Sequence, residues 1–581
     1  MGVNRVLYLA PPLAVLLAAG LAAQPDETFV DTIDVQVVEV DAVVTDRRGR
    51  PVSGLKREDF ELLVDGELVE IASFYEANVV GERPDRGNDQ LESSQGAPAR
   101  ANEQFTVALY LDDANLLPSH RTRLLRRLVT AVEPWRTRNA SFMLARFEHR
   151  LEVLVPPTRD LNKLVEGAAA IPKGSPRALQ SSESARRYAI RSLIDSHEAC
   201  LSMQFCRPCQ DNWGELLSQA RQYAANETTR AGVAVDGLAD LVTTLAGVPG
   251  KKAVVYLTDG LPQRPGLSVL DYLGNQLCRD LRPNAPSEVA AEMVQYDEAS
   301  RFNRLAAHAN ANRVTFYGLD AAGLRSAVGD IAVDSPALAP RFENTSLFAV
   351  NAQSGLQIVS AETGGKALVN ANDLEILLDD VSSHLSASYS LGFQATPGKP
   401  GEIRQVSARL ASHAARSRRI DYRRSYREKS LDERLAERLL SVAYLGATEN
   451  PLAASVHFGS TEPQEENVHR LTVGVAVPAE AILALPLRGE ETGWLRLWLM
   501  AVEQKTGTRT PVRQKSLLVG GVSGTDAIND AYRFEVAMDL ASGSYQVAVG
   551  VRDEVTGVAS LVREPVTVPS AGAADDDAPR P

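Results

Sequence analysis

Acidic and amide side chains follow two apolar segments that have the composition of buried strands. These segments cover residues 105–111 and 252–257. Ligands of open α/β sheets bind outside the carboxyl ends of the strands. Carboxylate oxygens from two such ends could share one hard cation. The sequence therefore predicts a candidate metal site here, and its residues are Asp112, Asp113 and Asp259.

Other catalytic signatures are incomplete or missing from the sequence. His197-Glu198 begins like the zinc protease motif, but Leu201 stands where the second histidine is required. The chain has no GxSxG elbow, no Walker A loop and no GxGxxG turn. We therefore expect a protein that is not an enzyme.

The four cysteines, an even number, favour two disulfides in an oxidising compartment. All three connectivities are open, and at least one bridge should join two long insertions at about 173–228 and 262–292. The CxxC spacing also fits a thiol redox pair, although no thioredoxin-like strand precedes it. A zinc site is disfavoured because the second CxxC is missing. The residues concerned are Cys200, Cys206, Cys209 and Cys278.

The first 23 residues have the pattern of a secretory signal peptide. Arg5 precedes an apolar run and small residues follow, so cleavage is expected near Ala22 or Ala23. Pro11 and Pro12 interrupt the run, which is too short to span a membrane. The mature chain is thus expected in the periplasm or outside the cell, without a membrane span. A net charge of −13 excludes nucleic acid as an obvious partner.

A chain of 581 residues predicts three or four domains, at roughly 150 residues each. Continuous apolar runs alternating with helical patterns over 105–428 predict a doubly wound α/β domain, with a mostly parallel sheet spanning about 105–394. Alternating strands over 452–568 predict an antiparallel β-sandwich, joined to the α/β domain by a helix over 429–446. Residues 569–581 should form a disordered tail.

A small β unit is expected over 30–80, followed by a polar linker over 81–104. The apolar alternation changes phase between Val37 and Val38, which predicts a β-bulge. The pair Asp65-Gly66 predicts a tight hairpin turn.

Several segments together resemble the von Willebrand factor A domain, and more closely the von Willebrand factor A-related secreted proteins of acidobacterial type. The resemblance covers most of the chain. It implies a Rossmann-like α/β domain flanked by an N-terminal β unit and a C-terminal β-sandwich. The matching segments are 44–55, 59–60, 65–66, 249–253, 258–260, 317–324 and 362–365.

Domains of this family typically hold Mg²⁺ at a metal-ion-dependent adhesion site. By position, the resemblance assigns Asp112, Thr229 and Asp259 to that site. Ala114 and Leu116 occupy the two positions where the family has serine, so the site is degenerate. Asp113 and Asn115 are the candidate substitutes. In the alternative without a metal, the acids cap the following helix.

The leading hypothesis is an exported, non-enzymatic binding or adhesion protein with a protein partner and a degenerate Mg²⁺ site. A metal-independent envelope scaffold or assembly protein is the alternative. A periplasmic thiol oxidoreductase is a third hypothesis, and it requires free Cys206 and Cys209.

Overall fold

The computed structural model describes residues 37–78, 105–135, 140–172, 177–323 and 345–569. Short gaps within the last range fall at 371–372, 396–398, 400, 413, 447, 466, 488–489, 506, 521–526 and 528–529. The expected signal peptide, the linker and residues 570–581 of the tail lie outside the described residues. Among the helices that are described, none has the length and apolar character needed to cross a membrane.

A six-stranded sheet forms the centre of the chain, and its strand order is β10-β9-β8-β5-β6-β7. All neighbours are parallel except β6 and β7. Every residue of β5 and β8 is buried, as expected for parallel strands covered on both faces. The strands are β5 (Phe105–Asp112), β6 (Ala140–Phe147), β7 (Leu151–Thr158), β8 (Lys251–Thr258), β9 (Val314–Asp320) and β10 (Ala367–Leu368).

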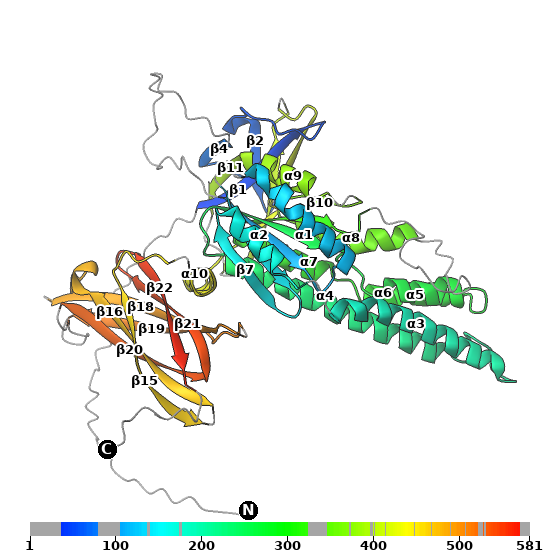
Figure 1. Ribbon diagram of the computed structural model, residues 1–581. Coiled ribbons are helices and arrows are strands. Elements are labelled where there is room, and N and C mark those ends of the chain that lie inside the picture. The colour runs from blue at the N-terminus through cyan, green and yellow to red at the C-terminus, as the bar shows by residue number, and fades with distance from the viewer. Residues whose placement is uncertain are drawn as a thin grey trace, which may run out of the picture.

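Helices cover both faces of this sheet (Figure 1). Because side chains alternate along a strand, Val107 and Leu109 pack in one core and Ala108 and Tyr110 in the other. The first core includes α1 (Pro118–Val132), α2 (Leu161–Ala169) and α9 (Leu374–Ser386). The second includes α4 (Trp213–Leu245), α7 (Ala299–Ala311) and α8 (Thr345–Glu362). The chain is thus a mixed α/β protein, as the sequence predicted in coarse outline.

The N-terminal strands do not form a unit of their own, which corrects the expected boundaries. They pair with strands from residues 387–427, which the sequence placed in the α/β domain, in sheets β13-β1-β11-β4 and β14-β12-β2-β3 that share one core. Few strands cannot bury a face alone, so the later strands complete it. They are β1 (Val37–Asp46), β2 (Phe60–Val64), β3 (Glu67–Val69), β4 (Ser73–Asn78), β11 (Ala387–Gln394), β12 (Ile403–Leu410), β13 (Arg418–Tyr422) and β14 (Ser425–Arg427).

Two local predictions for this region have different outcomes. Asp65 and Gly66 have φ of 50° and 88° and join β2 to β3, so the predicted hairpin is confirmed. The predicted bulge near Val37 is wrong for the described residues, because β1 pairs with β11 in continuous register from Val37 to Val43. The upstream half of the alternating pattern lies outside the described residues.

The two insertions fold together as a helical arm, which projects from the central domain in Figure 1. We define the arm as residues 177–225 and 267–294. It contains α3 (Arg177–Ser202), the first half of α4, α5 (Leu267–Asp271), a π-helix (Tyr272–Leu277) and α6 (Ala285–Val294). These helices have their own apolar core, which includes Trp213 and Leu216.

Two disulfides stabilise the arm. Cys200–Cys206 closes a short loop at the end of α3, and Cys209–Cys278 joins the two insertions with a Cα separation of 5.5 Å. This agrees with the expectation that one bridge links the insertions.

The helix α10 (Leu431–Leu445) lies between the central domain and the C-terminal sandwich. Ser430 caps its start by accepting from the Glu433 N–H, and the Ser441 hydroxyl donates to the Thr244 carbonyl of α4 over 2.7 Å. The sandwich consists of two antiparallel sheets around one core. Its strands are β15 (Ser455–Glu465), β16 (Val468–Pro478), β17 (Leu485–Leu487), β18 (Glu490–Glu503), β19 (Arg513–Gly520), β20 (Ala531–Ala541), β21 (Gly543–Asp553) and β22 (Ala559–Val568).

The two disulfides should contribute unequally to stability. The sequence separation is 69 residues for Cys209–Cys278 and 6 residues for Cys200–Cys206. The stabilisation that a disulfide gives by restricting the unfolded chain grows with the length of the loop that it closes. We expect the pair Cys209→Ser and Cys278→Ser to lower the free energy of unfolding of the arm by about 4 kcal/mol, and Cys200→Ser with Cys206→Ser by about 2 kcal/mol. Urea unfolding followed by tryptophan fluorescence measures both, and equal losses would contradict this account.

Candidate functional site

The predicted strand-end residues meet where β5 and β8 end. The two strands pair in parallel register, with Leu111 opposite Leu257, so Asp112 comes level with Thr258. The helix α1 begins directly after this turn, at Pro118. The register of the sheet therefore brings together carboxylates that are far apart in sequence.

Asp112 is buried and holds three donors on one oxygen. Its Oδ2 accepts from the Tyr256 hydroxyl at 2.6 Å, the Asn115 amide at 2.9 Å and the Thr258 hydroxyl at 3.0 Å. Its Oδ1 has no hydrogen-bond partner in the described part of the chain. Burial raises the pKa of Asp112, and these hydrogen bonds oppose the shift. The Asn115 side chain thus serves as a hydrogen-bond donor to Asp112.

Asp113 faces a different set of partners. Its Oδ2 lies 3.4 Å from Arg121 of α1 and 3.7 Å from Arg146 of β6. Burial raises the pKa of this carboxyl to about 6, although both guanidinium groups act in the opposite direction. Asp112 and Asp113 therefore contact different elements of the fold.

Asp259 caps the helix α1 from another strand. Leu117, the residue before the helix, has no side-chain acceptor to offer, and the Asp259 Oδ2 accepts its N–H at 2.5 Å. The other oxygen, Oδ1, lies 2.7 Å from the His120 Nδ1 in the first turn of α1. A carboxylate at a helix N-terminus is also stabilised by the helix dipole. Asp259 is therefore engaged by the helix that follows β5.

Thr229, assigned by the resemblance, lies away from any loop. It is exposed in the middle of α4, and its hydroxyl donates to the Ala225 carbonyl at 3.0 Å. The hydroxyl beside Asp112 belongs instead to Thr258. Thr258, Tyr256 and His120 were not predicted as site residues. Thr258 directly precedes Asp259 in the sequence, and His120 lies in the first turn of α1, whose start Asp259 contacts.

The residues present do not fit Mg²⁺, which requires near-octahedral oxygen coordination. Leu116 is fully buried in the apolar core, and Ala114 has no ligand atom. One oxygen of Asp112 and both of Asp259 are held by protein donors or His120. Within the described residues, no three His, Cys, Asp or Glu side chains are grouped as metal ligands would be. The chemistry that this cluster supports is hydrogen bonding and charge pairing.

The cysteines do not form the dithiol that redox chemistry requires. Cys206 and Cys209 belong to different disulfides, one with Cys200 and the other with Cys278. The CxxC spacing therefore does not correspond to a redox pair, and the thiol oxidoreductase hypothesis loses its basis.

Comparison with known proteins adds little to this geometry. No family model and no curated protein matches the sequence. Similar solved structures include an aerotolerance-related membrane protein from Bacteroides fragilis, with 11% identity over 49% of this chain and 98% of that chain, and a TM-score of 0.22. Another is BatB from Bacteroides thetaiotaomicron, with 10% identity, coverage of 48% and 98%, and a TM-score of 0.20. Scores this low support no conclusion, so the von Willebrand A assignment stays a prediction.

Removal of the Asp259 carboxylate should destabilise the fold. The variant Asp259→Ala loses the acceptor for the Leu117 N–H and the pairing with His120, so we expect the free energy of unfolding to fall by about 1–2 kcal/mol. Urea unfolding measures the change. Asp280→Ala, at an exposed aspartate, is the matched control and should have no effect. A loss as small as that of the control would refute the capping role.

Asp113 should make stability depend on pH. Its pKa is about 6 in the folded protein against an ordinary value of 3.8, so the folded state is stabilised when this carboxyl is protonated. This stabilisation is complete below about pH 4 and is lost as pH rises through 6. Relative to Asp113→Asn, the wild type should lose up to about 3 kcal/mol between pH 4 and pH 7. Loss of the Asp113 contact with Arg121 in the variant adds an offset that does not vary over this range. Denaturant unfolding at several pH values tests this, and a constant difference would count against it.

Proposed function

We propose that this chain is an exported, non-enzymatic, metal-independent scaffold that binds a protein partner through the end of its helical arm. The proposal is favoured over a metal-dependent adhesion protein because protein groups engage one oxygen of Asp112 and both oxygens of Asp259. Export is supported by two disulfides, which persist in oxidising compartments.

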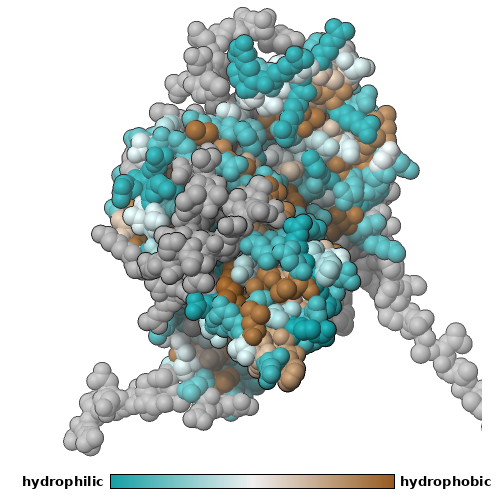
Figure 2. Space-filling view, turned by 90° about the vertical axis from the view of Figure 1, so that its right-hand side faces the viewer, coloured by the Kyte–Doolittle hydropathy of each residue, from teal (hydrophilic) through white to brown (hydrophobic). Residues whose placement is uncertain are grey.

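The observation that carries the proposal is an exposed apolar loop at the end of α3. Leu201, Met203 and Phe205 are 60%, 62% and 88% exposed. Figure 2 views the molecule from the side on which the arm projects, and hydrophobic surface is visible among hydrophilic side chains toward the viewer. Clustered exposed apolar side chains mark interaction sites more often than single ones do. We define these three residues as the apolar tip.

The apolar tip is also restrained before any partner arrives. The disulfide Cys200–Cys206 closes the loop that carries all three side chains, and α3 supports it from one side. A loop that is already ordered loses less conformational entropy on binding. Apolar and aromatic anchors of this kind fill pockets on a partner surface, which suits a protein partner.

The experiment is photo-crosslinking in the envelope of the native organism, followed by affinity measurement with the captured protein. We expect Phe205→Ser to weaken binding about 30-fold, the effect of losing an anchor worth about 2 kcal/mol. Chelation of divalent cations should leave binding unchanged. Leu68→Ser is the matched control, because Leu68 is 72% exposed on the β2–β3 hairpin. Binding that depends on a divalent cation, or that survives removal of all three tip side chains, would overturn the proposal.

A further inference from the structure

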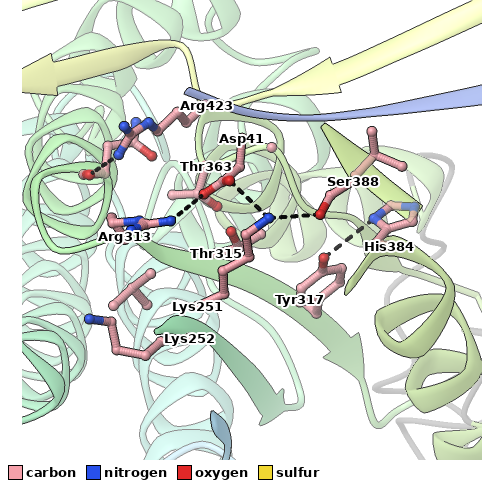
Figure 3. A pocket seen from close by; sticks show the side chains of 14 residues that line it. Asp41, Lys251, Lys252, Arg313, Thr315, Tyr317, Thr363, His384, Ser388 and Arg423 are labelled. Atoms are coloured by element: carbon pink, nitrogen blue, oxygen red, sulfur yellow. Dashed lines mark hydrogen bonds and ion pairs between the residues drawn. The ribbon is translucent and has the colours of Figure 1, made fainter. Parts of the chain in front are cut away.

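A polar cavity of about 40 Å³ lies at the opposite end of the central sheet, where β8 and β9 begin. The sheet β13-β1-β11-β4 covers this end. The lining therefore comes from both parts: Lys251 and Lys252 start β8, Asp41 belongs to β1, and Arg423 follows β13. Figure 3 shows Lys251 and Arg313 pointing toward Asp41.

The carboxylates near this cavity already form ion pairs with Lys251 and Arg313. Lys251 Nζ lies 3.0 Å from Asp41 Oδ1 and donates to the Ser388 hydroxyl at 2.8 Å. Arg313 lies 2.8 Å from Glu39 and 3.8 Å from Asp41. Burial raises the pKa of Asp41, but the nearby cations outweigh it and hold the value at about 2. Asp41 thus stays ionised and balances part of the positive charge.

Arg423 makes no close ion pair with the described residues. It is 7% exposed, its Nη1 donates to the Asn310 carbonyl at 2.8 Å, and its Nε has no hydrogen-bond partner in the described part of the chain. Burial lowers the pKa of Arg423 to about 10, and the charges of Asp41 and Glu39 oppose this shift. No acidic group of the described residues lies within ion-pair distance of it. Lys252 is buried as well and donates to the Val248 carbonyl at 2.9 Å.

The basic groups at this cavity outnumber the carboxylates. Lys251, Arg313 and Arg423 face two carboxylates, Asp41 and Glu39. Burial and neighbouring cations lower the pKa of Lys252 to about 7, so it carries only part of a charge at neutral pH. A buried cation without a close ion-pair partner costs several kcal/mol, and arginine does not escape this cost by losing its proton. A water molecule could accept from the Arg423 Nε but would not neutralise its charge.

We propose that this cavity binds a small inorganic anion, of the size of chloride or phosphate, beside the guanidinium group of Arg423. The anion completes the charge balance between the central sheet and the sheet that covers it. Bound there, it holds the N-terminal strands and residues 387–427 against the starts of β8 and β9.

Thermal unfolding in gluconate buffer at constant ionic strength tests the proposal, with chloride or phosphate replacing gluconate. Either anion should raise the Tm of the wild type by about 2–4 °C, and the rise should saturate. Arg423→Gln should abolish the rise. Arg424→Gln is the control, because the neighbouring Arg424 is exposed and pairs with Glu362, and it should keep the rise. No rise with either anion, or an unsaturated rise shared by all three proteins, would overturn the proposal.

A second measurement tests for the anion beside Arg423 if Arg423→Gln does not fold. Wild-type crystals grown with bromide in place of chloride should show anomalous density within hydrogen-bond distance of the Arg423 Nε. Bromide density at the surface alone, with a water in the cavity, would contradict the binding of chloride. If phosphate also fails to bind in calorimetry, the anion site is excluded.

Discussion

Buried carboxylates at the carboxyl ends of parallel strands need charge or hydrogen-bond partners, and this constraint organises the end of the central sheet where β5, β8 and β9 finish. At each of these strand ends, groups of the protein itself act as partners. Asp112 accepts from Tyr256 and Thr258, and Asp259 accepts from the start of α1. At the end of β9, Asp320 accepts from the Gln353 side chain at 2.8 Å. Because an unpaired buried charge costs several kcal/mol, these contacts fix where α1 begins and how β5 and β8 align.

At the opposite end of the sheet the buried charges are positive. Lys251 and Lys252 begin β8, and the sheet β13-β1-β11-β4 covers them. Lys251 meets Asp41 of β1 and Ser388 of β11. These contacts attach the N-terminal strands and β11 to the central domain, even though residues 79–386 separate the two groups of strands in the sequence. The charge that remains at Arg423 is the basis for an anion in this cavity.

Local patterns were predictable because they depend on neighbouring residues. The buried runs of β5 and β8, the turn at Asp65-Gly66, the Ser430 cap and the alternating strands of the sandwich follow from periodicity and turn chemistry. The pairing of β1 with β11 was not predictable, because no periodic pattern encodes which distant strands associate. Thr229 was assigned by position in a family, whereas Thr258 is placed by the register of two strands.

The claim that the strand-end carboxylates need no metal is tested most directly by Mn²⁺ binding followed by electron paramagnetic resonance. The account predicts that the spectrum of free Mn²⁺ is unchanged by an equimolar amount of the wild-type protein and by Asp112→Asn alike. Loss of the free Mn²⁺ signal with the wild type, restored by Asp112→Asn, would contradict it and return the adhesion site to consideration.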